Sequence, residues 1–134
     1  MKYLFFLKLF FILMVPGCRN GQTHFEKGVK YYEGKGVVIN YRTAAEHFLN
    51  ACYKGVREGC FKLGLMYEKG EGIPQSYKKA IEYYQSACDS GHAESCAGLA
   101  DIYTLGIGVH QNMGRAAILY RKACGLGLKK ACEK

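Results

Sequence analysis

The chain has 134 residues, 7 cysteines and a formal net charge of +8. A positive charge can favour nucleic acids or anionic membranes, but here no basic run is longer than two residues, as at Lys129-Lys130. We therefore expect no nucleic-acid partner, and contact with a membrane only through the N-terminus. A chain this small builds a thin core, so cross-links would contribute much to its stability.

Residues 1–17 are predicted to be a signal peptide and not part of the fold. Two lysines are followed by an apolar stretch over residues 9–15, which is too short to span a bilayer permanently. The stretch ends in Val-Pro-Gly before Cys18, which resembles a bacterial lipobox whose cysteine becomes lipidated. A lipid anchor on Cys18 and ordinary cleavage near residues 17–21 are the alternatives. Both predict a secreted or periplasmic protein.

Residues 22–36 are predicted to be a half-repeat containing one helix over residues 22–33. Its Lys27-Gly28-x-x-Tyr31 matches the phase of a Leu-Gly-x-x-Tyr motif that recurs later in the chain. Where the later repeats carry a cysteine, this segment carries His24. The partner position falls at Pro16, within the leader. With no preceding helix to join, the half-repeat needs no cysteine.

From there the chain repeats every 36 residues, over residues 41–72, 77–108 and a truncated 113–134. Alanine, aromatic, glycine and cysteine positions all recur at this spacing. Each repeat is predicted to be two helices, over about 77–89 and 93–105 in the central one, and the last second helix is cut to about two turns. The polar residue before each first helix is a good N-cap, at Asn40, Ser76 and Asn112. The prediction is an all-α solenoid of αα-hairpins.

Six cysteines fall in two of these columns, as three C-x7-C pairs. The repeat favours the pairing Cys52–Cys60, Cys88–Cys96 and Cys124–Cys132. Each bridge would join the end of one helix to the start of the next and would stabilise the fold by about 2.5 kcal/mol. Such bridges persist in oxidising compartments. Zinc is the alternative, although its cysteine ligands are usually closer together.

The pattern A-x-x-x-[FY]-x-x-A-C-x2-G…C-x-x-L-G-x-x-Y-x-x-G-x-G is similar to Sel1-like repeats. The cysteine columns resemble the disulfide-linked branch of that family, the cysteine-rich proteins of Helicobacter. The resemblance covers residues 22–134. It implies a superhelix related to tetratricopeptide arrays, which bind proteins or peptides in a concave groove.

The resemblance also implies which residues line such a groove, because the helix bearing Leu-Gly-x-x-Tyr faces it. Carried over position by position, the lining is Phe25, Val29, Tyr32, Glu33, Glu58, Phe61, Leu65, Glu68, Lys69, Glu94, Ala97, Asp101, Thr104 and Leu105. This mixed apolar and acidic set suits an extended segment with aliphatic side chains and a positive end. The alternative is that these are ordinary solvated helix positions.

Members of the cysteine-rich branch also carry a penicillin-binding or weak β-lactamase attribution. Ser76 and Lys79 match the S-x-x-K element of serine β-lactamases, but neither S-D-N nor K-T-G occurs in the chain. Ser76 also shares its column with two N-cap asparagines. We therefore expect no catalytic site, with a β-lactamase as the alternative reading.

No cofactor or metal is expected either. The four histidines, His24, His47, His92 and His110, fall in different columns, and no H-x-H or H-E-x-x-H motif occurs. Each is predicted to be a surface or turn residue. The leading hypothesis is an exported scaffold, facing the host or the envelope, that binds a protein or peptide. A purely structural spacer is a further alternative.

Overall fold

The structure, a computed structural model, describes residues 16–134. Nearly all of the predicted signal peptide therefore lies outside the described residues, and the side chain of Cys18, the predicted lipid anchor, lies outside them too. The described part contains six α-helices, one 3₁₀ helix and no strand. Their bounds are α2 Pro16–Glu33, α3 Tyr41–Tyr53, α4 Arg57–Lys69, α5 Tyr77–Asp89, α6 Ala93–Leu105, α7 Met113–Gly125 and η1 Lys129–Ala131.

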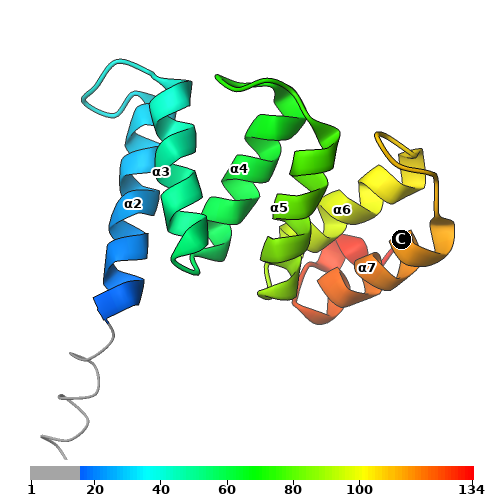
Figure 1. Cartoon of the computed structure of the whole chain (residues 1–134). Helices are drawn as coiled ribbons and strands as arrows, with labels where there is room; N and C mark the ends of the chain where they lie inside the picture. The colour runs from blue at the N-terminus through cyan, green and yellow to red at the C-terminus, as the bar shows by residue number, and fades with distance from the viewer. Residues whose placement is uncertain (1–15) are drawn as a thin grey trace, which may run out of the picture.

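The helices form a row in which each packs mainly against the next one along the chain (Figure 1). Helices α2 to α5 stand side by side, and α6 and α7 lie tilted across the end of that row. Within residues 16–134, extensive contacts join only consecutive elements. This is the predicted all-α solenoid of αα-hairpins. Among these helices, none is long and apolar enough to cross a membrane.

The two helices predicted for the central repeat are observed as α5 and α6, with the predicted bounds. Helix α2 is longer than predicted, because it begins at Pro16 and not at residue 22. Proline suits a first helical turn, where its missing N–H has no helical partner. The added turn packs along the connection after α3, where the buried Gly21 lies close to the side chains of Lys54 and Val56.

The end of the chain differs from the prediction of a helix of two turns. After α7 the chain forms only the 3₁₀ helix η1, over Lys129–Ala131. Starting an α-helix fixes several residues for a single hydrogen bond, so a segment of a few residues rarely forms one. Short segments of this kind form 3₁₀ turns instead.

The predicted N-caps are confirmed. Asn40 and Asn112 each accept a hydrogen bond from a backbone N–H three residues later, at 3.0 and 2.9 Å, and the Ser76 hydroxyl does so at 3.3 Å. At the other end of α4, Gly70 adopts a φ of +70°, which a residue with a Cβ rarely adopts. Local signals thus determine where the helices begin and end.

Small and aromatic columns fill the space between the helices. Ala44, Ala80 and Ala116 are buried, and so are Phe48 and Tyr84 in the aromatic column. The buried residues form one cluster over α3 and α4 and a larger one over α5, α6 and α7. Each helix buries one face against its neighbours, as stacking in a solenoid requires.

One disulfide joins α3 to α4, a second joins α5 to α6, and a third joins α7 to the residue after η1. They are Cys52–Cys60, Cys88–Cys96 and Cys124–Cys132, with Cα–Cα distances of 4.6, 4.7 and 4.8 Å. The pairing is the one predicted from the repeat. Because the six sulfurs are bonded to one another in pairs, they are not available as zinc ligands.

Candidate peptide-binding groove

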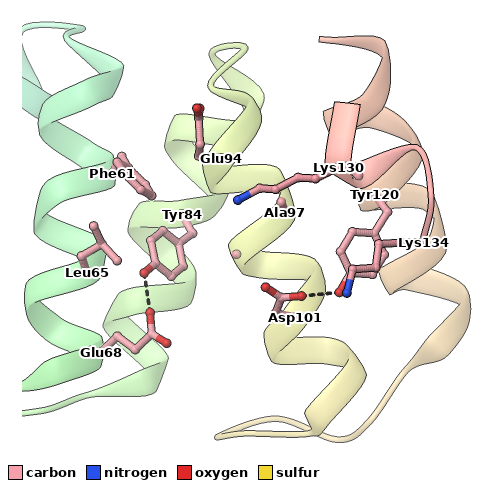
Figure 2. A pocket seen from close by; sticks show the side chains of 12 residues that line it. Phe61, Leu65, Glu68, Tyr84, Glu94, Ala97, Asp101, Tyr120, Lys130 and Lys134 are labelled. Carbon is pink, nitrogen blue, oxygen red and sulfur yellow. Dashed lines mark hydrogen bonds between the residues drawn. The ribbon is translucent and has the colours of Figure 1, made fainter. Parts of the chain in front are cut away.

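A hollow of about 430 Å³ opens on the face formed by the second helices of two neighbouring repeats (Figure 2). Helices α4 and α6 supply most of its lining, Tyr84 of α5 forms its floor, and α7 and the C-terminal segment close one side. The lining residues are Phe61, Leu65, Glu68, Tyr84, Glu94, Ala97, Gly98, Asp101, Tyr120, Lys130, Ala131 and Lys134. The hollow therefore depends on elements far apart in the sequence.

The floor of the hollow is apolar. Phe61 and Leu65 come from successive turns of α4, and Ala97 faces them from α6. The Tyr84 ring lies between these helices, 1% exposed, with its centroid 6.0 Å from that of Phe61. Because Ala97 and Gly98 are small, α6 leaves room above this ring. The result is a shallow apolar surface that suits an aliphatic side chain.

Two carboxylates on the walls are held by tyrosine hydroxyls. Tyr84 donates to Glu68, and Tyr120 donates to Asp101 (Figure 2). Burial raises the pKa of both tyrosines, and the hydrogen bonds to the carboxylates raise it further. Both hydroxyls therefore remain protonated donors at neutral pH. Each carboxylate keeps free lone pairs and is fixed in position at the edge of the hollow.

Two lysines of the C-terminal segment also reach the hollow, which the sequence reasoning missed. Lys130 lies one period after Glu94, so the repeat register itself places it in the groove column. The predicted lining, in contrast, ends at Leu105. Lys134 extends towards Tyr120, with its Nζ 6.0 Å from the ring centroid. The hollow is thus acidic on the helix side and basic on the side of the chain end.

The structure brings part of the predicted groove together. Phe61, Leu65, Glu94 and Asp101 line the hollow, with Glu68 and Ala97 of the wider set. The predicted lining does not include Tyr84 and Tyr120, because both lie on first helices and not on a helix that bears Leu-Gly-x-x-Tyr. A tyrosine on a first helix can pack its ring between the helices and still present its hydroxyl at the surface.

Other predicted positions lie elsewhere. Phe25 packs on Phe48 with ring centroids 5.7 Å apart, and the Tyr32 hydroxyl donates to Glu71 at 2.7 Å. Burial and this hydrogen bond raise the pKa of Tyr32 to about 12. The predicted positions that do not line the hollow are Phe25, Val29, Tyr32, Glu33, Glu58, Lys69, Thr104 and Leu105. Tyr32 lies beside α4, with the Lys62 Nζ 5.5 Å from its ring centroid, but it does not line the hollow.

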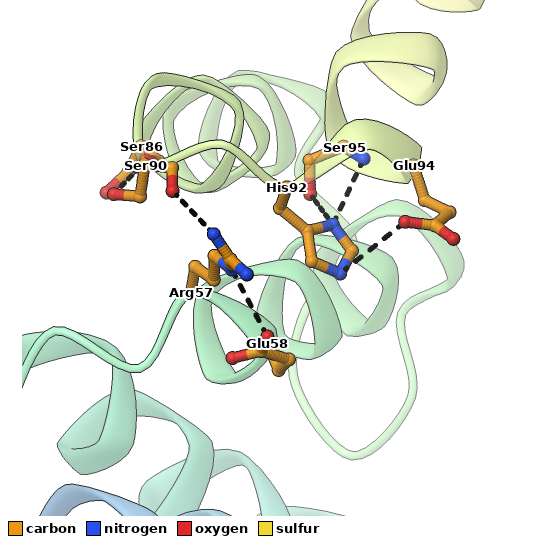
Figure 3. Close-up of polar contacts among 7 residues, drawn as sticks. All are labelled: Arg57, Glu58, Ser86, Ser90, His92, Glu94 and Ser95. Atoms are coloured by element: carbon orange, nitrogen blue, oxygen red, sulfur yellow. Dashed lines mark hydrogen bonds and ion pairs between the residues drawn. The ribbon is translucent and has the colours of Figure 1, made fainter. Parts of the chain in front are cut away.

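Beside the hollow, His92 fixes the start of α6 (Figure 3). Its Nδ1 accepts the backbone N–H of Ser95 at 3.3 Å, so the ring acts as the N-cap. The ring also packs on Phe61, with centroids 4.5 Å apart, and its side chain is only 13% exposed. Burial lowers the pKa of His92. It is a turn residue, as predicted, but it also supports the apolar floor.

A network of polar contacts surrounds His92 at the same turn. Arg57 donates to the backbone oxygen of Ser90 at 3.1 Å and pairs with Glu58 at 3.2 Å (Figure 3). Glu58 thereby lines a second, smaller hollow near Leu126 and not the groove. These contacts link the start of α4 to the turn between α5 and α6. They therefore help to fix the spacing of α4 and α6, which form the walls of the groove.

The two candidate catalytic residues lie outside the hollow. Ser76 caps α5 by accepting the backbone N–H of Lys79, and the Lys79 ammonium lies 5.1 Å from the Tyr67 ring centroid. The lysine is thus engaged with an aromatic face. Among residues 16–134, no group of three or more His, Cys, Asp or Glu side chains could hold a metal ion.

Comparison with known proteins points to one family. A family model described as the Sel1 repeat matches residues 27–56, 57–92 and 93–128. The structure is similar to a Sel1 repeat protein from Oxalobacter formigenes, with a TM-score of 0.81 and 31% sequence identity over 92% of this chain. The chain spans only 51% of that protein. A comparison with curated proteins gave no match.

Two further solved structures are similar. One is cysteine-rich protein B of Helicobacter pylori, with a TM-score of 0.68, 33% identity and coverage of 71% of each chain. The other is c5321, a protective antigen of uropathogenic Escherichia coli, with a TM-score of 0.79 and 30% identity. That match covers 83% of this chain and 24% of the antigen.

Proposed function

Because the chain belongs to the Sel1 repeat family, we propose that it is an exported scaffold that binds an extended peptide segment in the hollow between α4 and α6. Sel1 repeat proteins mediate protein–protein interactions, and they generally act as scaffolds and not as enzymes. The observation that carries the proposal is the hollow itself, where an apolar floor meets two fixed carboxylates.

The floor favours an aliphatic side chain. Phe61, Leu65 and Ala97 present carbon atoms to solvent over the buried Tyr84 ring. Covering this surface removes apolar area from water, which contributes roughly 25 cal/mol per Å² before the costs of association. The small residues on α6 leave the space that a branched side chain would fill.

The walls favour a basic group beside that side chain. Glu68 and Asp101 are held as acceptors by Tyr84 and Tyr120, so a ligand ammonium or guanidinium would meet oriented oxygens. The lysines at the chain end discourage a second basic residue on their side and suit a carboxylate there. The proposed ligand is therefore an extended segment with an aliphatic residue between a basic and an acidic group.

Three disulfides support a location outside the cytoplasm, because the reducing cytoplasm keeps cysteine thiols reduced. The signal peptide over residues 1–17 and the lipid anchor at Cys18 are part of this proposal. A Cys18→Ala protein that remains attached to membranes would rule out the anchor, and labelled palmitate on Cys18 would support it.

Selection from a random peptide display library tests the groove. The expected peptides combine an aliphatic residue with Lys or Arg, and fluorescence anisotropy then measures their affinity. Leu65→Asp should weaken binding at least ten-fold, because it places a carboxylate on the apolar floor. The matched control is Leu105→Asp, since Leu105 is 68% exposed and lies outside the hollow.

A second pair of variants tests the charges. Asp101→Lys should abolish the preference for basic peptides, whereas Asp89→Lys, on the outer end of α5, should leave it unchanged. Circular dichroism verifies that each variant is folded. Failure to enrich any peptide, or equal binding by wild type and Leu65→Asp, would contradict the groove and favour a purely structural spacer.

A further inference from the structure

Helix α2 differs from the later second helices at the position that carries their bridging cysteine. One period before Cys60, that position is His24. The residue lies against the next first helix, where its Nδ1 is 3.2 Å from the Nδ1 of His47 on α3. Two imidazole nitrogens therefore meet at the junction through which α2 is attached to the rest of the solenoid.

The separation of the two nitrogens matches that of two ligands on one metal ion. Imidazole nitrogens bind first-row ions at about 2.0–2.1 Å. Two such bonds at 90° to 110° place the nitrogens about 2.9–3.4 Å apart. The observed 3.2 Å lies within this range, so the rings could share an ion with little movement.

The surroundings favour binding. Both histidines are partly exposed, so an ion can enter and water can complete its coordination. The Tyr31 ring stacks on His47, with centroids 5.8 Å apart and an interplanar angle of 13°, which holds that ring in place. Burial lowers the pKa of His47, and the nearby His24 and Lys27 lower it further against the opposing effect of Glu46. The neutral ring is the form that binds metals.

We propose that His24 and His47 form a two-histidine chelate for a divalent transition-metal ion, with Cu²⁺ bound more tightly than Ni²⁺ or Zn²⁺. Imidazole suits all three ions, and the order follows their general affinity for nitrogen ligands. In the described part of the chain, no third His, Cys, Asp or Glu joins the pair, so water fills the other positions. The ion would link α2 to α3, a junction between repeats, whereas the disulfides lie within the later hairpins.

Calorimetric titration of the untagged, oxidised full chain with CuCl₂, NiCl₂ and ZnCl₂ tests this proposal. A Cys18→Ser background removes the seventh cysteine as a competing ligand. We expect one Cu²⁺ per chain, and binding at least ten-fold weaker in either His24→Gln or His47→Gln. The matched control is His110→Gln, since His110 is exposed in the loop between α6 and α7.

Spectroscopy supplies a readout that does not depend on the stability of the variants. In the wild-type chain, Cu²⁺ should show electron paramagnetic coupling to two imidazole nitrogens and should broaden the NMR signals of His24 and His47 before those of His92. Equal loss of binding in His110→Gln, coupling to a single imidazole, or broadening that begins elsewhere would overturn the proposal. His24 and His47 would then only share a hydrogen bond between their rings.

Discussion

The N-terminal and C-terminal parts of this solenoid use the same repeat unit but hold it together differently. In the C-terminal part, Cys88–Cys96 is fully buried in a continuous core that includes Tyr84 and Leu99. At the N-terminus, no disulfide holds α2 in the described residues, and it docks through non-covalent contacts such as Phe25 on Phe48 and His24 on His47. Cys60 bonds back to the preceding helix, whereas His24, one period earlier, contacts the following helix, so the same repeat position serves different junctions in the two parts.

The two parts also differ in how tightly the helices approach. Gly28 and Gly64 occupy equivalent positions, and a Cβ there would lie 2.6 Å from Phe48 and 2.7 Å from Tyr84. One period later the residue is Ala100, and the aromatic partner Tyr120 is only half-buried. The close approach of helix backbone and aromatic ring is thus shared by the first two units, and the third has a larger facing residue.

The largest expected effect concerns the covalent side of this comparison. Removing the central bridge with Cys88→Ala and Cys96→Ala should lower the free energy of unfolding by about 2.5 kcal/mol, because the unfolded chain regains the conformational entropy that the bridge removes. Urea unfolding measures it. The matched control is Cys124→Ala with Cys132→Ala, which opens a loop of the same length at the exposed chain end. Because the loops are equally long, chain entropy predicts equal losses, and burial of Cys88 and Cys96 predicts a larger loss from the central bridge. A larger loss from the terminal bridge would contradict that role of burial.

The next effect concerns the non-covalent side. Gly28→Ala should destabilise the docking of α2 by about 1–3 kcal/mol, because the new methyl group overlaps the buried Phe48 ring. Gly98→Ala is the control within a helix, since its nearest ring atoms are 3.8 Å away. That variant should stabilise the protein by up to about 1 kcal/mol through helix propensity. Amide exchange in α2 and α6 distinguishes the two outcomes.

A smaller effect tests a feature that the parts share, the N-cap. Ser76→Ala should cost about 1 kcal/mol in thermal unfolding, whereas Ser76→Asn should be nearly neutral, because asparagine caps the equivalent helices. The same proteins should show no turnover of a chromogenic cephalosporin. Turnover by the wild type that disappears in both variants would instead establish Ser76 as a nucleophile.

The smallest expected effect is a pH dependence. Burial lowers the pKa of His47 below its ordinary 6.5, so the folded chain binds fewer protons than the unfolded chain near that pH. Stability should therefore be highest above pH 6.5 and fall as the pH drops from 6.5 towards the lower folded pKa. In His47→Gln, amide exchange of α2 should lose this dependence. An unchanged pH profile in that variant would assign the effect to another group, such as His92.

The groove shows how far prediction from sequence extends. Phe61, Leu65, Glu94 and Asp101 were predicted to lie on one face, because the resemblance to tetratricopeptide arrays implies that the second helix of each repeat lines the groove. The same rule included Phe25 and Tyr32, which pack at the N-terminal end instead. It also left out Lys130, which lies one period after Glu94, and Lys134, which follows η1 and lies beyond any position that was carried over.

What the sequence determined by itself is local and periodic. The N-caps act over three residues, and each disulfide joins cysteines eight residues apart, so the pattern alone was enough to predict them. The tertiary structure decided which side chains from different helices meet. The bonds from Tyr84 to Glu68 and from Tyr120 to Asp101 and the His24–His47 pair depend on how adjacent hairpins rotate against one another. Those rotations are set by the packing of whole helices and not by any short motif.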